Sequence, residues 1–103
     1  MLVKFNNHYL ESLYEGNPVK GKPRYSQQVI KKFIQKINIL KNVENSANLS
    51  QFRGLNFEEL KGDKKGVYSI RVDLSYRLEF LLENNIIMLT EIVIIEDLTN
   101  HYQ

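Results

Sequence analysis

The chain of 103 residues contains no cysteine and only two prolines. The lack of thiols excludes disulfides, thiolate nucleophiles and cysteine-based zinc sites, and it agrees with a reducing compartment. No apolar run is long enough to cross a bilayer, and residues 1–14 carry Lys4, Asn6, Asn7, His8 and Glu11 where a signal peptide would have an uninterrupted apolar region. These absences predict a soluble, cytoplasmic protein and remove the best ligands for metal chemistry. Neither a membrane nor a small-molecule cofactor is expected as a partner.

The length of 103 residues, with 43% hydrophobic residues, is sufficient for one two-layer core. The sequence has no internal repeat or low-complexity tract, so residues 1–103 are expected to form a single domain. A net charge of +2 is too small to indicate nucleic-acid binding by itself. The charges are unevenly distributed, however, with cations gathered in residues 20–36 and 61–65 and a group of acids towards the end, in residues 79–97.

The first half of the chain predicts a strand followed by two helices. Leu2 to Phe5 alternates apolar and polar residues as a short strand does, and Tyr9 to Tyr14 has helical spacing. Both prolines lie in the basic loop of residues 16–24, which should join the two helices. From the N-cap Ser26, an apolar stripe at intervals of three and four predicts a helix as far as Leu40.

In the second half the apolar period changes to two, which is strand patterning. The first two strands should form a hairpin across Asp73-Leu74-Ser75, and a third strand rich in β-branched residues should complete a meander. The predicted elements are strands at residues 66–73, 76–83 and 86–95, a turn at Asn84-Asn85 and a polar tail at residues 96–103.

Helices that precede strands are typical of an α+β fold. We therefore expect the N-terminal strand and two helices to pack on one face of a mainly antiparallel, twisted sheet that ends in a β-meander. With Tyr68, Ile70, Val72, Leu78 and Phe80 on the helix-covered face, the pleat predicts an open, polar and cationic face. Its expected members are Ser69, Arg71, Arg77 and Glu79.

Arg71 and Arg77 are the first candidates for chemistry. They lie on neighbouring predicted strands and on one side of the sheet, so both guanidinium groups could reach one phosphate of a nucleic acid. The alternative interpretation is structural, because exposed sheet faces often carry cross-strand ion pairs, and Arg77 could pair with the strand neighbours of Glu79.

His101 and Tyr102 follow the last predicted strand, where a short extension could fold towards the two arginines. A histidine titrates near neutral pH and can pass a proton when a ribose 2′-hydroxyl attacks the neighbouring phosphate. The tyrosine could stack on a base or donate a proton. The alternative is that the pair belongs only to a disordered chain end. His8, in the first predicted helix, is expected to be a surface residue.

The turn from Lys61 to Gly66 carries Lys61, Lys64 and Lys65. It does not match the phosphate-binding loop of nucleotide hydrolases, which ends in Lys-Ser or Lys-Thr and opens a helix. The sequence therefore gives no support for ATP chemistry. The turn is either a solvated connection or an electrostatic guide for an RNA backbone.

Residues 60–72, followed by residues 76–80, resemble the signature of HigB-type toxins of the RelE/ParE superfamily. In that family a Leu-Lys-Gly-Asp turn, a Tyr-Ser-Ile-Arg strand and a Tyr-Arg pair recur together, as they do here. The opening strand, the two helices and the late strand around Glu91-Ile92-Val93 fall in the family's order. The resemblance implies the RelE-like fold and an endoribonuclease that cuts mRNA in the ribosomal A site without a metal. It also implies a helix-turn-helix antitoxin of the HigA type.

The family's phosphate-binding cations match Arg71 and Arg77. Its catalytic histidine is usually preceded by Asp-Tyr, whereas here the strand runs on and Asn100 precedes His101. The resemblance therefore implies that both arginines neutralise the scissile phosphate and that a longer tail brings His101 to it as general acid or base. Tyr102 or Tyr76 would orient the RNA, with Ser69 and the lysines Lys61, Lys64 and Lys65 as further RNA contacts.

Two other interpretations remain open at this point. A ParE-like toxin would inhibit DNA gyrase on the same fold without cutting RNA, although such chains have no need of a terminal His-Tyr pair. A remnant of the toxin fold would only bind its antitoxin or operator DNA, with residues 20–24 as the contact surface. Toxicity on expression would exclude the remnant, and an intact activity after replacing both His101 and Tyr102 would favour gyrase inhibition.

Overall fold

The computed structural model describes residues 1–100 of the chain. The first half contains the strand β1 (Leu2–Phe5) and the helices α1 (His8–Glu15) and α2 (Gln27–Asn42), as the sequence predicts. The Asn7 side chain accepts a hydrogen bond from the Leu10 amide and so caps α1, and Ser26 caps α2 through the Val29 amide. The basic loop between these helices contains no regular element, in agreement with its two prolines.

The second half consists of strands and short 3₁₀ turns. The elements are η1 (Ser46–Gln51), η2 (Arg53–Leu55), β2 (Glu58–Glu59), η3 (Gly62–Lys64), β3 (Tyr68–Arg71), β4 (Arg77–Asn85) and β5 (Thr90–Thr99). They form a five-stranded sheet in the order β1-β5-β4-β3-β2, in which β1 runs parallel to β5 and every other neighbouring pair is antiparallel. The predicted α+β fold with a mainly antiparallel sheet and a meander is confirmed.

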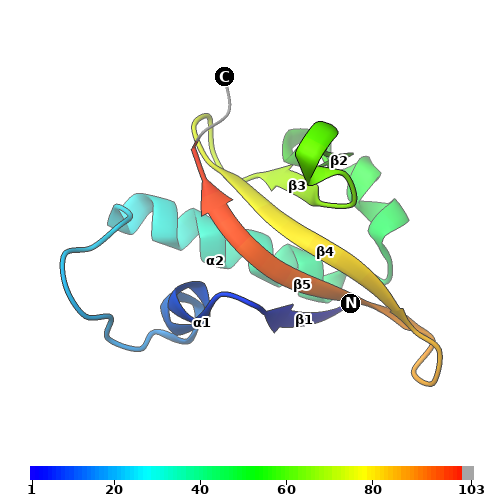
Figure 1. Ribbon diagram of the computed structural model, residues 1–103, viewed down its shortest axis with the longest axis horizontal. Coiled ribbons are helices and arrows are strands. Elements are labelled where there is room, and N and C mark those ends of the chain that lie inside the picture. The colour runs from blue at the N-terminus through cyan, green and yellow to red at the C-terminus, as the bar shows by residue number, and fades with distance from the viewer. Residues whose placement is uncertain (101–103) are drawn as a thin grey trace.

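Figure 1 shows α2 lying across the sheet while β4 and β5 form a long twisted hairpin over it. The helices cover one face because their apolar stripes meet those of the strands. Fully buried residues of this core include Phe33, Ile37 and Leu40 from α2 and Phe80 and Val93 from the hairpin. None of the described helices combines the length and the apolar character needed to span a membrane.

The β4–β5 ladder contains a β-bulge. Glu79 lies opposite Asp97 and Phe80 lies opposite Ile95, so Glu96 is left over between the two pairs. The Glu96 carboxylate accepts a hydrogen bond from the Asn6 side chain at 2.8 Å, and its carbonyl accepts one from Asn7 at 3.1 Å. The bulge thus ties the end of β1 and the start of α1 to β5.

The predicted third strand is displaced along the chain. Asn84 and Asn85 belong to β4, the turn is formed by residues 86–89, and β5 continues through Glu96 to Thr99, where the sequence predicted a polar tail. The predicted turn at Asn84-Asn85 and the predicted polar tail from residue 96 were therefore wrong. Cross-strand packing in the core sets the register: Leu82 lies opposite Val93, and the pairing extends along both strands in each direction. The strand β2, with two residues, was too short to show a period.

Truncation of the core should destabilise the fold strongly. Phe33 is completely buried, so Phe33→Ala should lower the free energy of unfolding by about 3–5 kcal/mol through lost contacts and a cavity. Leu74, which is 96% exposed in the β3–β4 turn, offers a matched control. Leu74→Ala should change the free energy of unfolding by less than about 0.5 kcal/mol. Urea unfolding at equilibrium measures both values, and equal effects would contradict the assigned core.

Candidate functional site

Arg71 and Arg77 lie directly opposite one another at the paired ends of β3 and β4. Directly opposed residues of an antiparallel pair project from the same face, so both side chains leave the sheet on the face away from α2. Their environments differ: Arg71 is exposed, whereas the Arg77 side chain is 10% exposed. The structure thus brings together the two predicted cations in one place, with one open to solvent and one held inside.

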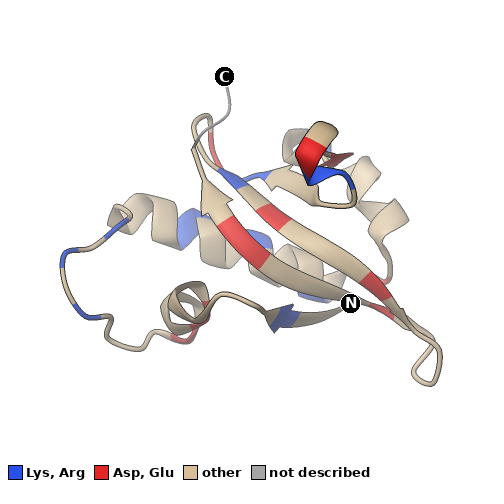
Figure 2. Ribbon diagram, viewed as in Figure 1, with Lys and Arg blue, Asp and Glu red and all other residues tan. Residues whose placement is uncertain are grey.

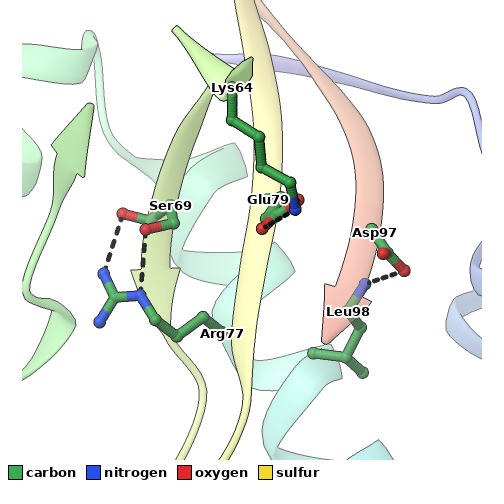
Figure 3. Close-up of polar contacts among 6 residues, drawn as sticks. All are labelled: Lys64, Ser69, Arg77, Glu79, Asp97 and Leu98. Atoms are coloured by element: carbon green, nitrogen blue, oxygen red, sulfur yellow. Dashed lines mark hydrogen bonds and ion pairs between the residues drawn. The ribbon is translucent and has the colours of Figure 1, made fainter. Parts of the chain in front are cut away.

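Arg77 is held by polar groups from three segments. Its Nε donates to Oγ of Ser69 at 3.0 Å, and a terminal nitrogen donates to the Asn56 carbonyl at 2.7 Å (Figure 3 shows the contacts with Ser69). The same nitrogen lies 3.6 Å from a carboxylate oxygen of Glu58. A buried cation requires such partners, and they fix the guanidinium plane. The sequence allowed a structural role in which Arg77 pairs with the strand neighbours of Glu79. Ser69 is such a neighbour, because it lies directly opposite Glu79, and Arg77 does contact it.

Asn56 adopts a left-handed backbone conformation with φ of 49°. Asparagine tolerates this conformation better than most residues, and it turns the chain after η2. The segment that follows carries Glu58 beside Arg77, so the path of the backbone from η2 to β2 places two acceptors at the guanidinium. The turn after η2 and the short edge strand β2 together complete the environment of Arg77.

Glu79 is covered by the same part of the chain. Both of its carboxylate oxygens accept hydrogen bonds from Nζ of Lys64, at 3.1 and 3.0 Å (Figure 3). The Glu79 side chain is 5% exposed while that of Lys64 is 55% exposed. This ion pair fastens η3 over the sheet and compensates the charge of Lys64 locally.

The predicted open, cationic face is therefore wrong in part. Ser69, Arg77 and Glu79 are buried, because the segment from η2 to η3 folds over them, and only Arg71 of the four is exposed. Pleat alternation placed all four on the correct face. It carried no information about a connection that returns across that face to cover it.

An aromatic hollow whose lining includes one cation, Arg24, and one anion, Asp97, lies at the end of β5. Tyr25 contacts the rings of both Tyr9 and Tyr76, with centroids 6.2 and 5.6 Å away. The Arg24 guanidinium lies over the Tyr9 ring at 4.2 Å from its centroid. Arg24, Tyr25, Tyr76 and Thr99 are among the residues lining a hollow of about 270 Å³, and Thr99 lies directly opposite Arg77.

Tyr25 anchors the basic loop to the last strand. Its hydroxyl donates a hydrogen bond to the Leu98 carbonyl at 2.7 Å. Burial, and next the nearby charge of Asp97, raise the pKa of Tyr25 to about 12. The hydroxyl is thus a neutral donor, and the loop residue Arg24 is held next to the end of β5.

The remaining predicted site residues are distributed around this centre. Tyr76 lines the hollow, while Lys61 and Lys65 are exposed and line a second depression of about 240 Å³ on the far side of β3. His101 and Tyr102 lie outside the described residues. His8 is on the surface, with a side chain 92% exposed, as expected. In residues 1–100 no cluster of three or more His, Cys, Asp and Glu side chains has the arrangement of a metal site.

Sequence reasoning missed part of this site. It placed Arg24 in an exposed loop between the two helices and Asp97 in a tail, and it gave no role to Asn56 and Glu58. The one available signal was the sequence Pro23-Arg24-Tyr25, since an aromatic residue beside an arginine in a polar loop often anchors that loop. The contacts of Asn56 and Glu58 depend on tertiary folding and leave no local pattern.

The sequence matches the HigB-like toxins, described as RelE-like toxins of the type II toxin-antitoxin system HigB, over residues 3–92. The chain belongs to this family. As a toxin of a type II system, it has an antitoxin as its partner. The matched region includes all but the first residue of β1, both helices and the two arginines.

The solved structures add support for the fold. A YoeB/ParE toxin from Agrobacterium tumefaciens is similar over 99% of this chain and 100% of its own, with a TM-score of 0.58 and 20% sequence identity. Identity this low shows a common fold and does not transfer an activity. Comparison with curated proteins gives no match.

The environment of Tyr25 predicts how the toxin's stability depends on pH. Because the folded pKa of about 12 exceeds the ordinary value of 10.0, the tyrosine's contribution is complete below pH 10 and is lost as the pH rises towards 12. Tyr25→Phe should cost about 1 kcal/mol at pH 9, through the lost hydrogen bond, and less at pH 11. Urea unfolding of both proteins at the two pH values measures this, and a cost that grows with pH would contradict it.

Proposed function

We propose that this toxin is an endoribonuclease that cuts mRNA in the ribosomal A site, by attack of a ribose 2′-hydroxyl and without a metal ion. The observation that carries the proposal is the placement of exposed Arg71 directly opposite anchored Arg77. Two guanidinium groups at one point of the sheet stabilise a phosphate on which negative charge develops. The ribosome would hold the substrate in position, which so small a protein can hardly do alone.

The two arginines have different tasks in this mechanism. Arg71 is free to move onto the phosphate, because within residues 1–100 it is exposed and makes no ion pair. Arg77 contributes a positive charge at a fixed position within the protein, since Ser69, Asn56 and Glu58 restrain its guanidinium. A preorganised charge requires no rearrangement as the transition state forms.

The chemistry would proceed in one displacement at phosphorus. The 2′-oxygen forms a bond to phosphorus as its proton passes to a general base, and the bond from phosphorus to the 5′-oxygen breaks as that oxygen takes a proton. The products are a 2′,3′-cyclic phosphate and a 5′-hydroxyl end. We assign the proton transfers to His101 and Tyr102, which follow β5 in the sequence within three residues of Thr99.

The hollow beside Arg77 supplies contacts for the nucleotides that flank the cut. The half-buried Tyr76 ring, which lines this hollow, would stack on a base, and Arg24 provides a further cation. The exposed lysines Lys61 and Lys65 would contact RNA elsewhere on the surface, whereas buried Ser69 would act by holding Arg77 and Lys64 is paired with Glu79. The antitoxin of this system would be a helix-turn-helix protein of the HigA type. Action on ribosomes places the toxin in the cytoplasm.

Induced expression of variants tests the proposal. The wild type should arrest growth and create new mRNA 5′ ends within reading frames, while Arg71→Ala should reduce cleavage about 100- to 1,000-fold through loss of one phosphate contact. Arg71→Lys keeps the charge without the planar fork and should be intermediate. Lys31→Ala, on the exposed side of α2, is the control that removes a cation elsewhere.

The Arg77 and His101 variants separate the remaining roles. Arg77→Ala should abolish cleavage and also destabilise the fold, because it leaves buried acceptors unpaired, so thermal unfolding is measured alongside. His101→Ala should abolish cleavage with unchanged stability if His101 carries the proton. Growth arrest without new mRNA ends, together with inhibited DNA supercoiling, would overturn the proposal and indicate a gyrase inhibitor.

A further inference from the structure

The turn between β4 and β5 consists of four consecutive large apolar residues that project into solvent. Ile86, Ile87 and Leu89 are 85%, 94% and 89% exposed, and Met88 is 57% exposed. This tip, residues 86–89, stands at the far end of the long hairpin in Figure 1, beyond the helices and the rest of the sheet. Single exposed apolar residues are common, but a contiguous exposed group usually marks an interaction site.

The turn does not need these residues in order to form. Asn85 at the end of β4 accepts a hydrogen bond from the Met88 amide at 2.9 Å, which closes the turn through a polar side chain. Leu89 has φ of 54°, a left-handed conformation that favours glycine or asparagine over leucine. Local chain geometry therefore favours small polar residues at this turn. The aliphatic side chains of residues 86–89 are not needed to stabilise the fold.

The charges around the tip indicate what it binds. An open groove of about 680 Å³ lies beside it and is lined by Ile86 and Leu89, and the charged side chains in its lining, Glu44 and Glu91, are both acidic. The Glu91 carboxylate accepts hydrogen bonds from Ser46, and the terminal ammonium of Met1, which also lines the groove, donates to main-chain carbonyls at the end of α2. Exposed Glu83 lies on the neighbouring strand near the tip. In Figure 2 this end of the hairpin carries acidic segments and an uncharged turn, while the basic loop lies on the opposite side of the molecule.

An acidic surface repels the phosphates of RNA, so the tip is not suited to ribosomal or messenger RNA. A protein segment with aliphatic or aromatic side chains flanked by lysine or arginine complements both the apolar turn and the acidic groove. The established partner of a toxin of this family is its antitoxin. We propose that the tip and its acidic groove are a docking site for such an apolar and basic segment of the antitoxin.

The location of this docking site has a functional consequence. The tip lies at the opposite end of β4 from Arg77, so the antitoxin segment would not contact the candidate site. It would act by adding bulk to the projecting hairpin, which keeps the toxin from its target. The inference rests on membership of the toxin family and does not depend on RNA cleavage.

The test compares two turn variants of the full chain for binding to the purified cognate antitoxin. Replacing both isoleucines, Ile86→Ser with Ile87→Ser, should weaken binding about 100-fold, since each buried isoleucine is worth roughly a factor of ten or more. Leu74→Ser, in the turn at the other end of β4, is the matched control and should bind as the wild type does. Calorimetric titration gives the dissociation constants, and circular dichroism verifies the fold of each variant.

Three results would overturn the inference. Wild-type affinity of the tip variant for antitoxin excludes the docking site. If sedimentation shows that the toxin alone self-associates and that the serine substitutions abolish this, the tip is an interface between copies of the chain. If ribosome binding falls and antitoxin affinity does not, the tip serves the ribosome. The inference also predicts that the tip variant retains the toxicity of the wild type but is no longer neutralised, whereas Arg71→Ala remains bound by antitoxin.

Discussion

Nine consecutive residues of β4, Arg77 to Asn85, pair with β5 from Thr90 to Thr99, and the two surfaces of interest lie at opposite ends of this hairpin. At about 3.4 Å per residue, β4 separates its two ends by roughly 27 Å. One end brings Arg77 beside Arg71 and Thr99, and the other projects an apolar turn into solvent. The core contacts of Phe80 and Val93 fix the register, so the same packing that stabilises the sheet positions both surfaces.

Arg77 connects the β4–β5 hairpin to the proposed phosphate site. Arg77 would be costly to bury alone, and Ser69, Asn56 and Glu58 make its burial tolerable by supplying polar partners. These contacts in turn hold the segment from η2 to β2 in place over the sheet. Arg71, directly opposite, has no such restraint within the described residues. The pair therefore combines a restrained, buried charge with an exposed one, and the proposed stabilisation of a phosphate rests on this arrangement.

Local patterns were sufficient to predict most of the fold. The cap at Ser26, the apolar stripe of α2 and the alternation in β3 and β4 depend on neighbouring residues, so they can be seen in the sequence. The run from Ile86 to Leu89 misled the prediction because β-branched and aliphatic residues are typical of strands, and here they form a turn. The pairing of Arg71 with Arg77 followed from alternation, whereas the cover over Arg77 and the approach of Arg24 depend on long-range contacts that no local pattern encodes.

The most direct test of the account is made in a purified system. The toxin is added to ribosomes that carry a defined mRNA in the A site, and the RNA ends are analysed chemically, with naked mRNA and a gyrase supercoiling reaction in parallel. The account predicts cuts only on the ribosome, with 2′,3′-cyclic phosphate and 5′-hydroxyl ends that disappear with Arg71→Ala. Intact mRNA together with inhibited supercoiling would contradict it.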